Sequence, residues 1–83
     1  MLKLMNYQER IVRDQRVVGG EPVFKGTRVT LRTVLASLAE GATTEEILAD
    51  FPTLSEEDVR AAIAFAATSA QEDLPLAESP IKR

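Results

Sequence analysis

The segment GGEPVFKGTRVT, residues 19–30, stands between an extended N-terminal third and the first helical pattern of the chain. Glycine adopts positive φ without a Cβ penalty, so Gly19-Gly20 predicts a tight reversal between residues 16–18 and residues 22–24. The same segment also suits an ordinary solvated loop. Its spacing matches neither G-x-x-x-x-G-K-[ST] nor G-x-G-x-x-G, which excludes a nucleotide-binding loop.

Short extended pieces flank this segment. Ile11-Val12 is β-favourable, and Asp14-Gln15 is an acceptable turn. Pro22 fits the first position of an edge strand because it has no amide proton to donate. A ribbon this short is not stable alone in water. We therefore expect it to lie on the helices or to pair with another chain, which makes the N-terminal third a dimerisation candidate.

Three helices are predicted after the ribbon, over residues 30–40, 43–51 and 55–70. Leu31 opens an apolar stripe at the positions i, i+3, i+4, i+7 and i+8. Thr43 and Glu46 have the spacing of a capping box, and Ser55 and Asp58 repeat it at the third helix. The fold class is therefore mainly α, with a short N-terminal β-ribbon followed by a three-helix, helix-turn-helix bundle.

Proline and the loss of periodicity set the boundaries of the predicted domain. Residues 1–9 are expected to be an arm or a partial strand, and residues 10–70 are expected to form the domain. Residues 71–83 contain Pro75 and Pro80 and lack a helical or strand period, which predicts a flexible tail. This tail either orders on a partner or is only a terminal remnant. The predicted partner-binding residues of the tail are Leu74, Leu76 and Ile81.

The charges are divided along the chain. Residues 1–33 carry seven bases and three acids, a net charge of +4, whereas residues 34–83 carry three bases and ten acids, a net charge of −7. One half can therefore meet an anionic partner and the other a basic partner. The longest apolar run is too short to span a bilayer, and residues 1–6 do not resemble a signal peptide, so we expect a cytoplasmic protein.

No cysteine and no histidine are present among the 83 residues. Their absence removes thiolate nucleophiles, the commonest general base near neutral pH and the usual zinc ligands. The acidic clusters at residues 45–46 and 56–58 open predicted helices, where carboxylates stabilise the positive end of the helix dipole. We therefore expect no enzyme, no metal, no cofactor and no small-molecule substrate.

The second and third predicted helices have the lengths and the short connection of a helix-turn-helix, whose later helix enters the major groove of DNA. Residues 56–58 make the entering end acidic, so bases of the first third are expected to contact phosphates, with Thr53 and Arg60 near base edges. The predicted DNA-binding residues are Lys25, Thr27, Arg28, Arg32, Thr53 and Arg60. The alanine-rich surface of the third helix suits the core or the close approach of another helix.

The pattern Gly19-Gly20-x-Pro22-Val23-x-x-Gly26-Thr27-Arg28-Val29 resembles the signature of the domain-of-unknown-function 433 family. Segments at residues 35–41, 45–52 and 54–63 follow in order, and the resemblance covers about residues 10–68. Members are similar to helix-turn-helix modules of homeodomain-like or winged-helix-like form, and many look like antitoxins encoded beside a PIN-like ribonuclease toxin.

The resemblance implies a type II antitoxin, expected to be a homodimer, that binds a PIN-like toxin and, with it or alone, its own operator DNA. The acidity of residues 56–58 favours an alternative function, that of an interaction module. In that alternative the chain is a dimerisation or adaptor module whose helix-turn-helix no longer binds DNA.

Overall fold

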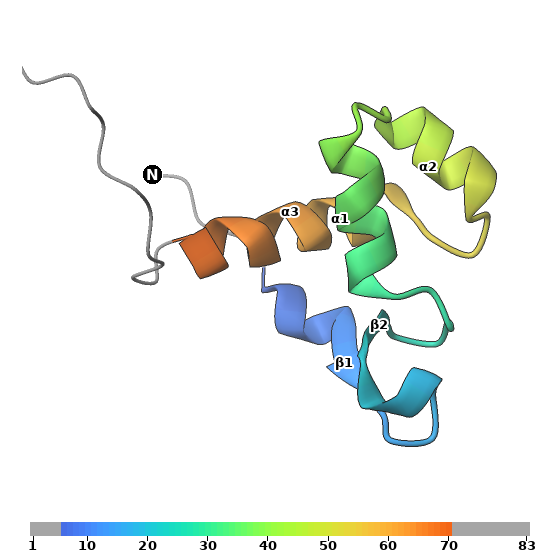
Figure 1. The fold of residues 1–83 in the computed structure, drawn as a ribbon, viewed down its shortest axis with the longest axis vertical. Helices are drawn as coiled ribbons and strands as arrows, with labels where there is room; N and C mark the ends of the chain where they lie inside the picture. Colours follow the sequence, from blue (N-terminus) through green and yellow to red (C-terminus); the bar gives the residue numbers. More distant parts are fainter. Residues whose placement is uncertain (1–5, 71–83) are drawn as a thin grey trace, which may run out of the picture.

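A computed structural model describes residues 6–70, which form a short ribbon and three helices (Figure 1). The strands are β1 (Ile11–Arg13) and β2 (Pro22–Phe24), and the helices are α1 (Leu31–Ala39), α2 (Thr44–Asp50) and α3 (Glu56–Ala70). Two 3-10 turns, η1 (Tyr7–Glu9) and η2 (Val18–Gly20), precede the strands β1 and β2. This order confirms the predicted fold class. The tail residues Leu74, Leu76 and Ile81 lie outside the described residues.

The ribbon pairs within the chain. β1 and β2 are antiparallel, with Val12 opposite Val23 and Ile11 opposite Phe24. Pro22 is the first residue of β2, as predicted. The predicted tight reversal at Gly19-Gly20 is wrong, because residues 14–21 join the two strands and η2 replaces the expected lead-in strand.

Backbone geometry explains this difference. Val18, Gly19 and Gly20 have φ values of 47°, 61° and 85°, so all three leave the extended region in succession. The preceding turn is closed by Asp14, whose side chain accepts a hydrogen bond from the Arg16 amide at 2.9 Å. The segment therefore coils back as a longer connection, and residues 11–13 become the partner of β2.

The predicted caps are present in the structure. Thr30 accepts from the Thr33 amide at the start of α1. At α2, Thr43 Oγ1 accepts from the Glu46 amide at 3.1 Å, and the Glu46 carboxylate accepts from the Thr43 amide at 2.7 Å. Gly41 has a φ of 95° just beyond α1, the left-handed conformation that commonly ends a helix. Local hydrogen bonds thus set the helix boundaries.

One apolar cluster joins the ribbon to all three helices. Phe24 from β2 is fully buried and packs with side chains of α1, α2 and α3. The buried members of the cluster are Phe24, Leu31, Val34, Ile47, Leu54, Val59 and Ala62. None of the helices within residues 6–70 is long and apolar enough to cross a membrane.

Residues 7–9 form the turn η1 on α3, whereas the residue pattern predicts an arm or a partial strand. The ring of Tyr7 meets the ring of Phe65 edge to face, with centroids 5.3 Å apart and an angle of 81°. Such an aromatic pair contributes about 1 kcal/mol beyond the area it buries. This contact attaches the residues that precede β1 to the second half of α3.

Replacing Thr43 by alanine should lower the free energy of unfolding by about 1 kcal/mol, because the cap on α2 is lost. Thr44→Ala removes a hydroxyl one residue later but leaves the cap in place, so it is the matched control. Urea unfolding followed by circular dichroism measures both variants. Equal losses would show that the capping box does not stabilise α2.

Candidate nucleic-acid interface

The loop between β2 and α1 is held by its own hydrogen bonds. The Thr27 hydroxyl donates to the Phe24 carbonyl oxygen at 2.8 Å and accepts from the Val29 amide at 3.0 Å. The Phe24 amide in turn donates to the Val29 carbonyl oxygen at 3.0 Å. Lys25 and Arg28 are exposed on the outside of this loop. The hydroxyl of Thr27, a predicted DNA-binding residue, therefore donates its proton within the loop and helps to fix the loop's conformation.

A shallow hollow of about 470 Å³ lies where this loop meets the connection between α2 and α3. Its lining comes from β1, the β1–β2 connection, β2, the β2–α1 loop and the α2–α3 turn: Val12, Asp14, Val17, Val23, Gly26, Thr27, Arg28 and Thr53. Three of the predicted DNA-binding residues thus meet at one place. Within residues 6–70, Arg28 makes no ion pair, so its guanidinium is available to an external anion.

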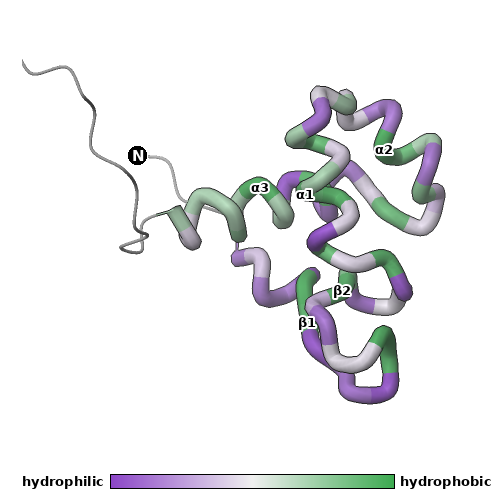
Figure 2. The backbone as a smooth tube through the Cα atoms, in the orientation of Figure 1, coloured by the Kyte–Doolittle hydropathy of each residue, from purple (hydrophilic) through white to green (hydrophobic). Residues whose placement is uncertain are grey.

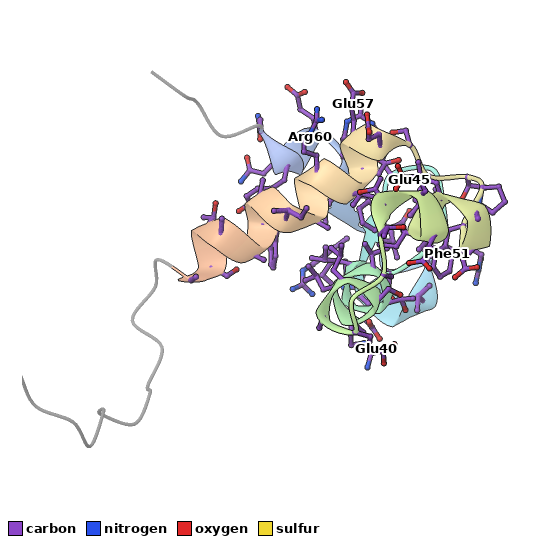
Figure 3. All side chains as sticks on the ribbon, turned by 90° about the horizontal axis from the view of Figure 1, so that it is seen from above. Glu40, Glu45, Phe51, Glu57 and Arg60 are labelled. Carbon is purple, nitrogen blue, oxygen red and sulfur yellow. The ribbon has the colours of Figure 1, made fainter. Side chains whose placement is uncertain are left out.

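The other predicted DNA-binding residues lie elsewhere. Lys25 borders a charged depression with Glu9, Arg10 and Asp58. Arg32 on α1 donates to Glu21 at 2.9 Å and lines a different hollow. Arg60 is exposed on α3, on the same side of that helix as Glu57 (Figure 3). The structure therefore gathers only half of the predicted set.

Arg10 is a residue that the sequence pattern did not single out. Its guanidinium pairs with Glu57 and, at 3.2 Å, with Asp58 Oδ1. The other carboxylate oxygen of Asp58 accepts from the Ser55 amide at 2.9 Å and so caps α3. Asp58 thus serves both contacts. Arg10 pairs with two of the three carboxylates at the start of α3, and its single positive charge offsets one of their three negative charges. Arg10 is 47 residues from Glu57 and 48 residues from Asp58, so no local sequence pattern connects them. Only the folded structure identifies these two contacts.

Asp14 brings a negative charge to the hollow that also contains Arg28. The Arg16 side chain, and then the Arg16 amide, donate to the Asp14 carboxylate and hold its pKa below the ordinary value, with slight desolvation opposing them. The side-chain contacts measure 3.2 Å and 3.3 Å. The carboxylate is therefore ionised at neutral pH and remains bound to Arg16.

The family model described as "Protein of unknown function (DUF433)" matches residues 11–66, more than half of the chain. This chain belongs to the DUF433 family. The matched residues begin at β1 and end within α3, so the ribbon and the helices together form the family unit. They include every residue of the Arg28 hollow and exclude Arg10.

Two relatives support this membership. The crystal structure of a DUF433 member protein from Anabaena variabilis ATCC 29413 matches with a TM-score of 0.67 at 31% identity, covering 77% of this chain and 63% of that chain. The uncharacterized protein y4eO of Sinorhizobium fredii (strain NBRC 101917 / NGR234) is 37% identical over 59 residues, which is 71% of this chain. This DUF433 chain covers 27% of the length of y4eO.

Asp14 should titrate below its ordinary pKa of 3.8, and Arg16→Ala should raise its pKa toward that value. Because the folded pKa is depressed, the ionised pair stabilises the fold above the unfolded pKa, and this stabilisation is lost as the pH falls through the folded pKa. Carbon-detected NMR titration of the Asp14 carboxyl measures the pKa.

The matched control is Arg13→Ala, because the Arg13 side chain donates to the Gly20 carbonyl and not to Asp14. An Asp14 pKa that stays the same in the Arg16→Ala variant would contradict the assigned cause.

Proposed function

We propose that this DUF433 chain is the antitoxin of a type II toxin-antitoxin pair, which neutralises a PIN-like ribonuclease toxin and represses its own operon by binding DNA. The DNA-binding part of this proposal rests on the placement of Arg28 and Thr53 in the same hollow. An exposed cation on a hydrogen-bonded loop and a hydroxyl at the turn between α2 and α3 line the same hollow. A cation with no ion pair among residues 6–70 can neutralise a phosphate without first breaking a contact.

In this proposal the β2–α1 loop positions the protein on the DNA backbone. Arg28 and Lys25 contact phosphates, while Thr53 and Arg60 approach base edges or sugars. The pairing of Arg10 with Glu57 and Asp58 supports it, because it reduces the negative charge at the end of α3 that faces the DNA in a helix-turn-helix. A homodimer would present two such loops to two half-sites.

The toxin-binding part rests on charge and on the family resemblance. A ribonuclease binds an anionic substrate and therefore carries a basic surface. Residues 34–83 have a net charge of −7, counted from three bases and ten acids, which complements such a surface. Leu74, Leu76 and Ile81 supply apolar anchors within the acidic segment. The chain acts by binding only, with no enzymatic step of its own.

The adaptor function is the second candidate, and a different observation favours it. Arg10 and Arg32 are already engaged with carboxylates of the same chain. Asp14 also places a negative charge in the hollow beside Arg28. Both features weaken the attraction for phosphates, so an adaptor that binds only protein would explain them without DNA.

Arg28→Ala should flatten the salt dependence of binding to the DNA upstream of the gene, with the slope of log K against log salt falling by about one unit. Arg13→Ala is the matched control, because it removes the same charge from an exposed side chain of β1 that does not line the hollow. Fluorescence anisotropy of a labelled duplex at several salt concentrations measures the slope.

The outcome separates the two candidates. Equal slopes for Arg28→Ala and Arg13→Ala would remove Arg28 from the interface. Undetectable binding to the upstream DNA, both by the chain alone and by its complex with the toxin, would leave the adaptor function.

Changing Leu74, Leu76 and Ile81 together to aspartate should weaken capture of the PIN-like toxin encoded next to the gene, because the three apolar anchors are lost. The loss should be about tenfold or more, since each buried leucine or isoleucine contributes about 1.5 to 3 kcal/mol. Ala77→Asp in the same segment is the control. Co-purification and calorimetry measure binding, and unchanged affinity would refute the role of these residues.

A further inference from the structure

A turn at the start of the β1–β2 connection holds an exposed arginine. The chain leaves β1 through the hydrophilic residues 13–16, and the connection extends past the ends of the two strands (Figure 1, Figure 2). The Asp14 carbonyl oxygen accepts from the Val17 amide at 2.8 Å, and its carboxylate accepts from the Arg16 amide at 2.9 Å. The Asp14 side chain is 34% exposed and the Arg16 side chain 89% exposed. The turn therefore keeps the carboxylate close to the protein and presents the arginine to the outside.

Arg16 pairs with Asp14 through one edge of its guanidinium. Nε donates to Oδ1 at 3.2 Å, and Nη2 donates to Oδ2 at 3.3 Å, so both carboxylate oxygens are used. A guanidinium has five N–H donors in one rigid plane. The other edge, formed by Nη1 and Nη2, keeps two parallel donors and makes no hydrogen bond within the described part of the chain. The carboxylate thus sets the plane in which this free edge lies.

The pair stands at the Arg28 hollow, because Asp14 is one of the residues that line it. The negative charge of Asp14 alone would repel a phosphate, but Arg16 offsets it. With Arg28, the three side chains carry one net positive charge. A nucleic acid that meets Arg28 is therefore attracted to this place and comes close to Arg16.

We propose that Arg16, oriented by Asp14, reads a guanine in the major groove of DNA while Arg28 contacts the phosphate backbone. Guanine presents two adjacent acceptors there, O6 and N7, and two parallel N–H donors of arginine match them. Adenine places an amino donor beside its N7, so it cannot accept both donors. The major groove also admits a two-stranded ribbon. This inference rests on the proposed DNA binding and adds the residue and the base that give it specificity.

The pairing with Asp14 favours a base over a phosphate as the partner of Arg16. A phosphate on the free edge would bring a second anion next to the Asp14 carboxylate, and the two like charges repel each other. Guanine is uncharged, so its acceptors meet the same edge without that repulsion. Arg28 makes no ion pair among residues 6–70, which makes it the better phosphate contact of the two.

Replacing guanine by 7-deazaguanine tests this contact directly, because it removes the N7 acceptor and preserves base pairing. The probe is a labelled duplex of the DNA upstream of the gene, with one guanine replaced at a time. Fluorescence anisotropy with the full chain should show about tenfold weaker binding at one or more of these guanines. Arg16→Ala should bind the normal and the modified duplexes equally well there. Equal losses for the wild-type chain and for Arg16→Ala at every guanine overturn the inference.

Two further variants separate orientation from charge. Asp14→Asn deletes a negative charge, so attraction to phosphates should not fall, but the tenfold effect of 7-deazaguanine should largely disappear. Glu21→Gln is the matched control, because it deletes the same charge from an exposed pair with Arg32 outside the hollow, and it should retain the tenfold effect. Arg16→Lys keeps the charge but lacks the planar guanidinium, so it should lose the effect without changing the salt slope.

The outcomes distinguish this inference from the proposed function. If the wild-type chain, alone and in complex with the toxin, does not bind the upstream DNA, both are overturned. If the chain binds and Asp14→Asn retains the full effect of 7-deazaguanine, this inference alone is overturned. A flatter salt slope for Arg16→Ala, with the effect of 7-deazaguanine unchanged, would place a phosphate at Arg16 and would also overturn it.

Discussion

The structure depends on the burial of Phe24. A ribbon of two three-residue strands is not stable in water, so it must pack against something larger. Phe24 is completely buried in the cluster that contains Leu31 and Val34 of α1, and such burial contributes about 2 kcal/mol. Its amide also bonds Val29, and its carbonyl accepts from Thr27. The loop that presents Arg28 therefore has its conformation because Phe24 is anchored.

Ion pairs change how the charges of this DUF433 member are distributed. Along the sequence the bases precede the acids, but in the structure Arg10 meets Glu57 and Asp58 at the start of α3. Exposed pairs of this kind contribute about 0 to 1 kcal/mol, and the contact with Asp58, which is only 13% exposed, is the more protected. Their main effect is on the surface, because the end of α3 becomes less negative and Arg28 becomes the prominent cation near the α2–α3 turn.

Two surfaces with different chemistry share the β2–α1 region. The Arg28 hollow combines a cation, a carboxylate and hydroxyl groups, which suits a hydrated and salt-dependent partner such as a phosphate backbone. The hollow between β2, α1 and α3, whose lining includes Pro22, Leu31 and Phe65, is apolar and suits contact with protein. β2 and the loop after it connect both surfaces to the same core.

The sequence by itself determined the features that depend on neighbours within a few residues. The caps at Thr30 and Thr43, the strand position of Pro22 and the three helices follow from such local contacts. The tertiary structure decided which strand pairs with β2, which acids meet Arg10, and that only Thr27, Arg28 and Thr53 of the predicted set come together. These pairings depend on which side chains share the core. Gly19 and Gly20, which suggested a hairpin, therefore shape a longer connection between the strands. Residues that are distant in the sequence become neighbours only when Phe24 is buried.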